Sequence, residues 1–143
     1  MAYTPTYFKA YELVPKSVYD RFADMSIQFL DPGILAAADC LRKVFGPCTV
    51  NNWHEQGTLD ECGLRVFGGD QFAKRPLSAH CQGKALDLHF KNITSEEIRD
   101  WFRHGQDAVY PVLLAIKRIE VDTAWLHIDN LNVDRMVWVK IPK

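Results

Sequence analysis

Long apolar runs and secretion signals are missing from this sequence of 143 residues. A membrane-spanning helix needs about 20 consecutive apolar residues, and no run approaches that length, so we expect no membrane insertion. Residues 1–16 lack the basic start and the continuous apolar stretch of a secretion signal. We therefore expect the protein to be cytoplasmic as synthesised.

Concentrated positive charge is also missing. No run of Lys or Arg exceeds two residues, and the formal net charge is −1. Because binding to phosphate backbones needs a concentrated positive face, we expect no nucleic-acid partner. No segment is basic enough to favour an anionic membrane surface.

The four cysteines, Cys40, Cys48, Cys62 and Cys81, form no CxxC pair. The missing pair argues against a closed structural zinc site built from cysteines. An even number allows two disulfides, but without a secretion signal we expect reduced thiols.

Internal repeats, low-complexity segments and Gly/Ser linkers are absent as well. The length suits one domain, and apolar residues make up 48% of the chain, which is enough for a hydrophobic core. We expect a single domain over residues 1–143, acting as a monomer.

Two helices are expected before residue 47. Apolar residues recur at helical spacing over residues 16–25 and again over 34–45. Asp31 can cap the second helix, Pro32 suits its first turn, and Gly46 ends it.

Strands dominate the rest of the chain. A capping box of Thr94 and Glu97 opens one further helix, and residues 107–116 predict a short one. Residues 54–79 read as a long loop with a short extended piece near 64–66. Strands are predicted over residues 48–53, 84–90, 118–121, 124–129 and 135–141, with a hairpin around residues 122–123. This order predicts an α+β fold, with N-terminal helices packed on a mainly antiparallel sheet.

The most informative pattern is Ser-Ala-His-Cys-Gln-Gly-Lys-Ala-Leu-Asp over residues 78–87. His80 and Asp87 supply an imidazole nitrogen and a carboxylate oxygen, which are both good zinc donors. Gly83 permits a tight turn between them, where we expect the backbone to pass close to the metal. Asp87 shares its strand face with His89.

A second pattern, Trp-Leu-His-Ile-Asp, places Trp125, His127 and Asp129 on one face of a strand. With His80 and Asp87, His127 completes a set of two histidines and one carboxylate. Such a set leaves a fourth zinc position open for water, as catalytic sites do. We therefore expect these three residues to bind one Zn²⁺ ion.

The order SxHxxGxAxD and then WxHxD resembles the zinc peptidases of the M15 type. That group includes D-alanyl-D-alanine carboxypeptidases, dipeptidases and phage L-alanyl-D-glutamate endolysins, and the Hedgehog signalling domain shares its fold. Residues 45–53, followed by Gly63-Leu64-Arg65, resemble the segment that precedes the zinc motif in this group. The resemblance covers residues 30–130 and implies a Hedgehog/DD-peptidase-like fold.

The resemblance also implies roles for individual residues. His80, Asp87 and His127 correspond to the metal ligands. Arg65 corresponds to an arginine that contacts the substrate peptide or the developing oxyanion. Ser78 would form hydrogen bonds that orient the ligands.

The general base is where the sequence departs from the group. Some members carry Glu or Asp three residues before the last histidine ligand, but Ala124 stands there. We predict Glu120 as the base instead. If residue 120 pairs with 125 and residue 118 with 127, Glu120 lies diagonally beside His127.

Asp129 is the second candidate, either as the base or as the residue that fixes a ligand or the water. Asp122, at the presumed turn, is the third. His89 is a candidate for contact with the transition state.

We therefore expect a zinc metallopeptidase that hydrolyses a bond of the peptidoglycan stem peptide, as an endopeptidase or a D,D-carboxypeptidase. The absence of a signal and of a wall-binding module suggests a phage-encoded enzyme that reaches the cell wall after release or as part of a virion. Two alternatives stay open: a zinc-binding module without catalysis, which Ala124 favours, and a virion structural protein with a vestigial site.

Overall fold

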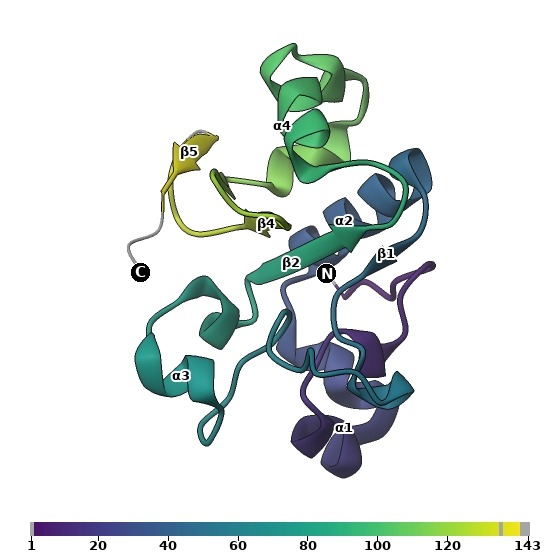
Figure 1. Ribbon diagram of the computed structural model, residues 1–143, viewed down its shortest axis with the longest axis vertical. Helices are drawn as coiled ribbons and strands as arrows, with labels where there is room; N and C mark the ends of the chain where they lie inside the picture. The colour runs from purple at the N-terminus through teal and green to yellow at the C-terminus, as the bar shows by residue number, and fades with distance from the viewer. Residues whose placement is uncertain (1, 135, 141–143) are drawn as a thin grey trace.

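The computed structural model describes residues 2–134 and 136–140, and within them it has an α+β architecture (Figure 1). The α-helices are α1 (Lys16–Phe22), α2 (Pro32–Phe45), α3 (Asp70–Lys74) and α4 (Ser95–Arg103). Short 3-10 helices are η1 (Ala10–Glu12), η2 (Ala23–Phe29), η3 (Trp53–Glu55), η4 (Ala79–Gln82), η5 (Gln106–Val109) and η6 (Pro111–Ala115).

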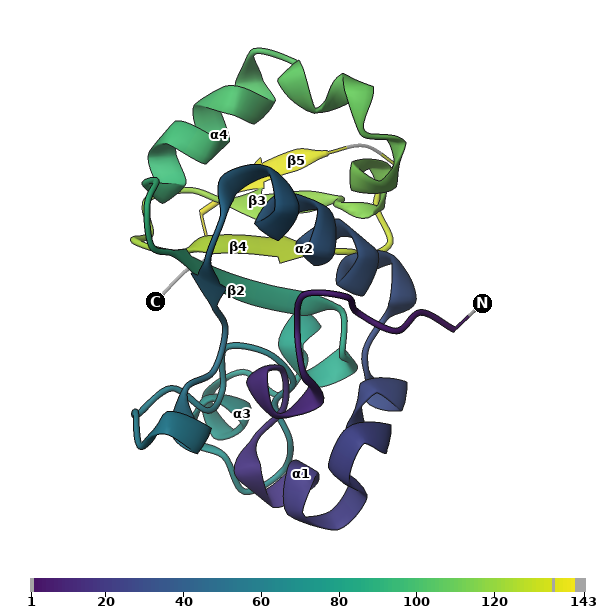
Figure 2. The ribbon, with the colours of Figure 1, turned by 90° about the vertical axis from the view of Figure 1, so that its right-hand side faces the viewer.

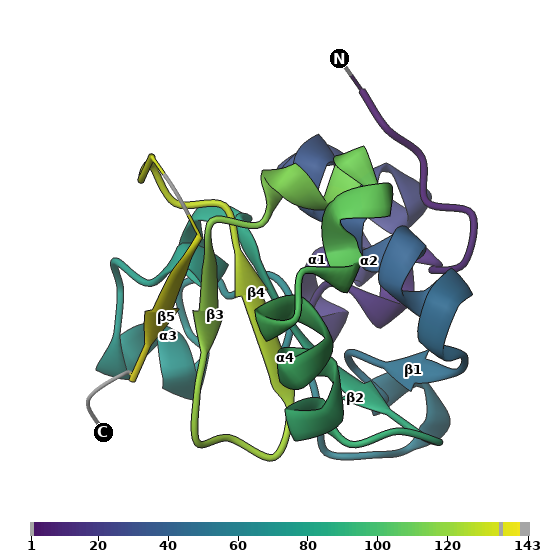
Figure 3. The ribbon, with the colours of Figure 1, turned by 90° about the horizontal axis from the view of Figure 1, so that it is seen from above.

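The strands form one mixed sheet in the order β1-β2-β4-β3-β5, which can be followed across Figures 2 and 3. Their bounds are β1 (Cys48–Thr49), β2 (Ala85–Phe90), β3 (Arg118–Glu120), β4 (Leu126–Asp129) and β5 (Val137–Val139). Only the β3–β5 pair is parallel in the described part of the chain. The α+β class is thus confirmed, while the Hedgehog-like arrangement stays a prediction.

Side chains of β2 and β4 alternate between two different environments. Leu86, Leu88, Leu126 and Ile128 belong to the hydrophobic core, which also holds the apolar face of α2. Figure 2 shows α2 crossing this side of the sheet. Since neighbouring residues of a strand face opposite ways, the residues between these leucines and isoleucine face the other side, where the candidate site lies.

The helix boundaries confirm the predicted caps. The Asp31 carboxylate accepts the backbone N–H of Ile34 at 2.9 Å, which places Pro32 in the first turn of α2. Thr94 and Glu97 form the predicted capping box at the start of α4. Each cap satisfies N–H groups that the helix itself leaves unpaired.

Several predicted elements are shorter or different. The helix predicted over residues 16–25 is α1 followed by the 3-10 helix η2, and that over 107–116 is two 3-10 helices. The strand predicted over 48–53 stops at Thr49, because the Asn51 side chain turns inward to bond Val14 and Cys62.

The loop predicted over residues 54–79 contains α3. The backbone N–H of Gln71, in the first turn of α3, donates to the Glu61 carboxylate at 3.0 Å. Arg135 and Ile141, the predicted ends of the last strand, lie outside the described residues. All four cysteines are free, as expected. In the part of the chain that is described, no helix combines the length and apolar character needed to cross a membrane.

Candidate metal centre

His80 lies in η4, and its ring is oriented by the backbone. Its Nδ1 is 2.8 Å from the carbonyl oxygen of Gly63, and the residue is 3% exposed. A carbonyl can only accept, so Nδ1 donates to it and Nε2 is the nitrogen that faces the site. That nitrogen is 3.2 Å from Oδ1 of Asp87.

Gly83 ends η4 in the left-handed region, with φ of +69°. The predicted tight turn is therefore confirmed. The structure adds a reason for glycine that the sequence did not indicate, because backbone from another segment passes close to this residue. A Cβ at position 83 would stand 1.9 Å from the carbonyl oxygen of Phe29.

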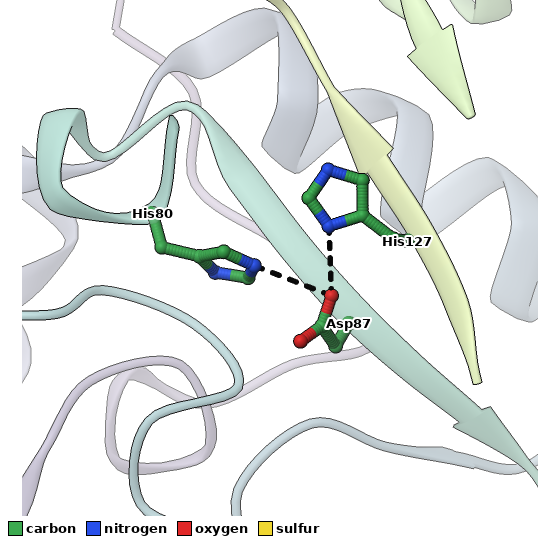
Figure 4. Close-up of side chains that lie close together, drawn as sticks. All are labelled: His80, Asp87 and His127. Atoms are coloured by element: carbon green, nitrogen blue, oxygen red, sulfur yellow. Dashed lines mark hydrogen bonds and ion pairs between the residues drawn. The ribbon is translucent and has the colours of Figure 1, made fainter. Parts of the chain in front are cut away.

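Asp87 and His127 face each other across the β2–β4 ladder, where they are partners in register. His127 Nδ1 is 2.9 Å from Asp87 Oδ1, the same oxygen that His80 approaches. Figure 4 shows the three side chains pointing toward one another from η4, β2 and β4. All three are buried.

The second nitrogen of His127 is also engaged, since Nε2 is 2.8 Å from Oδ2 of Asp129. Burial would lower the pKa of His127, but the hydrogen bonds to Asp129 and Asp87 outweigh it and raise the pKa to about 9. Burial likewise opposes the charged form of Asp87. The nearby His80 and His127 more than compensate and hold the pKa of that carboxyl well below its usual range.

His80, Asp87 and His127 each offer one ligand atom, and these three atoms lie within 4.8 Å of one another, so the three residues could hold a metal ion. Zinc bonds of about 2.0–2.1 Å in a tetrahedron would set neighbouring ligand atoms about 3.3 Å apart. Oδ1 of Asp87 lies 2.9 Å from His127 Nδ1 and 3.2 Å from His80 Nε2, which is close to that spacing. The donor set therefore fits zinc.

Arg65 lies beside the three ligands. Its terminal nitrogen is 3.6 Å from Oδ2 of Asp87, and its Nε donates to the carbonyl of Glu61 at 2.7 Å. The side chain is 12% exposed. The guanidinium thus reaches the edge of the site from the loop that precedes α3.

The predicted β3–β4 register is wrong by two residues. Arg118 pairs with Asp129 and Ile119 with Ile128, so the next rung would place Glu120 directly opposite His127. The error arose because the connection is longer than a two-residue hairpin turn. Asp122 takes a left-handed conformation there, with φ of +62°.

Glu120 is partly buried, and its pKa is raised. Burial is the main cause, the negative charge of Asp87 adds to it, and His127 opposes it. Asp122 instead points to solvent, with 69% of its side chain exposed and Lys140 at 3.6 Å. The structure thus brings Glu120 toward the ligands and leaves Asp122 outside.

Asp129 is fully buried and both of its oxygens are bound. One accepts from His127, and Arg118 contacts both, at 3.0 Å from Nε to each oxygen. This geometry favours the second of the two predicted roles, fixing a ligand. Arg118 was not among the predicted site residues, because the wrong register placed it opposite His127 and not opposite Asp129.

Two further predicted residues have other partners. The Ser78 hydroxyl lies 3.4 Å from the sulfur of Cys81, and the described residues give it no contact with a ligand side chain. Cys81 lies in η4, and its thiol also donates to the Arg75 carbonyl at 3.4 Å. His89 Nδ1 is 3.1 Å from the Thr49 carbonyl.

An apolar groove adjoins the site at Arg65 and has a volume of about 530 Å³. It is lined by Val18, Phe22, Phe29, Leu64, Arg65, Val66, Phe67, Phe72, Cys81 and Gln82. Phe67 is the most open of these side chains, at 90% exposed. The groove brings apolar surface up to the arginine that contacts Asp87.

Comparisons of the chain with protein-family models, with curated proteins and with solved structures found no match.

Proposed function

We propose that this chain is a zinc-dependent peptidase that hydrolyses a bond of the peptidoglycan stem peptide. One observation carries the proposal. Two imidazole nitrogens and one carboxylate oxygen, supplied by the SxHxxGxAxD and WxHxD segments, converge in a buried cluster beside a partly buried glutamate and an arginine. The choice of substrate, and of a phage-encoded enzyme, rests on the resemblance of those segments to the M15-type peptidases.

Each residue has a part in this proposal. His80, Asp87 and His127 would hold the ion. Zinc in this position supplies Lewis acidity, which polarises a peptide carbonyl and lowers the pKa of water toward about 7. Arg65 would donate hydrogen bonds to the oxyanion that develops on the substrate.

Glu120 would accept the proton of the attacking water and return it to the leaving amine. Its raised pKa supports this role, since a general base works best when its pKa approaches the working pH. The β3–β4 register supports it as well, since the next rung would place Glu120 opposite His127.

The test is digestion of murein by the purified, zinc-loaded protein, with mass analysis of the released peptides. We expect defined fragments that identify either an endopeptidase or a D,D-carboxypeptidase. Glu120→Gln should lower kcat by about 10²–10⁴-fold while zinc content stays at one ion. Asp122→Asn, two residues further along the chain, is the matched control, and it should keep wild-type activity because Asp122 is exposed and paired with Lys140.

A zinc-binding module without catalysis is the second candidate, and Ala124 is the observation that favours it. The backbone carbonyl of Ala124 accepts the Ser95 hydroxyl at 3.0 Å, and its methyl side chain can accept no proton. One zinc ion per chain with no fragment released from murein would establish that candidate and overturn the peptidase. Absence of bound zinc would overturn both.

A further inference from the structure

Arg118 and Asp129 form a cross-strand pair behind the candidate metal centre. They are register partners in the β3–β4 ladder. Arg118 contacts the carboxylate through Nε, at 3.0 Å from each oxygen, and through a terminal nitrogen at 2.9 Å from Oδ2. Asp129 is completely buried, whereas the Arg118 side chain is 24% exposed.

The carboxylate of Asp129 is held on every side. Beyond Arg118, its Oδ1 accepts the backbone N–H of Leu131 at 3.3 Å, and its Oδ2 accepts from Nε2 of His127 at 2.8 Å. With Nε2–H donating to a fixed oxygen, the ring plane of His127 is set and Nδ1 is turned toward Asp87 and His80. A carboxylate in this place fixes the tautomer and direction of a ligating histidine.

We propose that Arg118 is a positioning residue for the metal, acting through Asp129 on His127. It touches neither metal nor substrate. Its fork holds the Asp129 carboxylate in the one orientation that directs Nδ1 of His127 at the point where the ligand atoms converge.

Stability alone does not account for this pair. Burying an ion pair costs desolvation of both charges, and well-packed apolar residues in its place are often neutral or stabilising. The neighbouring rung, Ile119 with Ile128, faces the hydrophobic core. The Arg118–Asp129 rung lies on the other face, where its carboxylate reaches a candidate ligand.

The experiment is a double-mutant cycle read by zinc affinity, measured by competition with a chromophoric chelator. The variants are Arg118→Met, Asp129→Asn and the double variant. Second-sphere changes of this kind weaken metal binding by about 10–100-fold, and we expect Arg118→Met to fall in that range. In the Asp129→Asn background the same change should add less than about 3-fold, because Arg118 acts through Asp129.

Arg103→Met is the matched control. Arg103 also pairs with carboxylates, Glu96 and Asp100, but on the exposed face of α4. It should leave zinc affinity unchanged. Arg118→Lys keeps the charge without the fork, so it should fold and recover only part of the affinity. The Co²⁺ absorption spectrum should shift for Arg118→Met and stay at wild type for Arg103→Met.

Zinc affinity and a Co²⁺ spectrum equal to wild type in Arg118→Met would overturn the proposal. An equal loss in both Asp129 backgrounds would overturn it too, as would full recovery by Arg118→Lys. The inference rests on the metal site of the proposed function but not on catalysis. If wild type binds zinc but cleaves nothing, the peptidase proposal fails and this one stands. If wild type is active and Arg118→Met binds zinc as tightly as wild type, this proposal fails and the peptidase stands.

Discussion

Gly83→Ala should destabilise the protein far more than an ordinary glycine substitution. An L-residue in the left-handed region costs about 1–2 kcal/mol, and Gly83 has φ of +69°. The new Cβ would also stand 1.9 Å from the Phe29 carbonyl oxygen, which is rigid backbone. Relieving such a contact costs about 1–3 kcal/mol more, so we expect a total loss of about 2–5 kcal/mol.

Gly105→Ala separates the two contributions. Gly105 has nearly the same φ, +71°, but an added Cβ meets nothing within 4 Å. It should therefore lose only the conformational part, about 1–2 kcal/mol. Urea unfolding followed by circular dichroism, with an unchanged m-value, measures both losses. Equal losses in the two variants would refute the reasoning that Gly83 is required by the contact with Phe29.

Three other predictions concern the loop after β3, the protonation of His127 and the effect of zinc on stability. Arg99 is 2% exposed and donates to the carbonyls of Glu120, Thr123 and Trp125, so Arg99→Met should lose about 3 kcal/mol or more in urea unfolding. Arg103 forms its ion pairs at the surface, so Arg103→Met should lower the free energy of unfolding by no more than about 1 kcal/mol. Equal losses for Arg99→Met and Arg103→Met would contradict the role of burial. A proton and the metal compete for Nδ1 of His127, and the pKa of this residue is raised to about 9. Below about pH 9, zinc binding should therefore release a proton, and the affinity for zinc should increase about 10-fold for each unit by which the pH rises. Calorimetry in buffers of different ionisation enthalpy counts that proton, and no release at pH 7 would show that His127 is not a ligand. Zinc at about 100 times Kd should stabilise wild type by about 2.7 kcal/mol, which raises the melting temperature. A chelator should remove this rise, and His80→Ala, which lacks one ligand, should not show it.

The His80–Asp87 half of the candidate metal site could be predicted because the spacing of these two residues is local. His80 and Asp87 lie on one turn and the strand that follows it, and alternation along β4 places His127 on the face away from the core. The helix caps at Asp31 and Thr94 could also be predicted, since each cap bonds a residue only three positions away.

The rest depended on contacts between distant segments. The register of β3 on β4 follows from the left-handed Asp122 and from the Arg99 contacts with the connecting loop, neither of which alternation reveals. The same error hid the Arg118–Asp129 pair. The short β1 has a similar cause, because the Asn51 side chain bonds residue Val14, 37 positions earlier.

X-ray absorption at the zinc edge of the reconstituted protein tests the central claim most directly. We expect one zinc per chain with only nitrogen and oxygen neighbours at about 2.0–2.2 Å, two of them from imidazoles. Sulfur scattering at about 2.3 Å would instead place the ion on cysteine. That result, or a spectrum unchanged in His127→Ala, would contradict a site built from His80, Asp87 and His127.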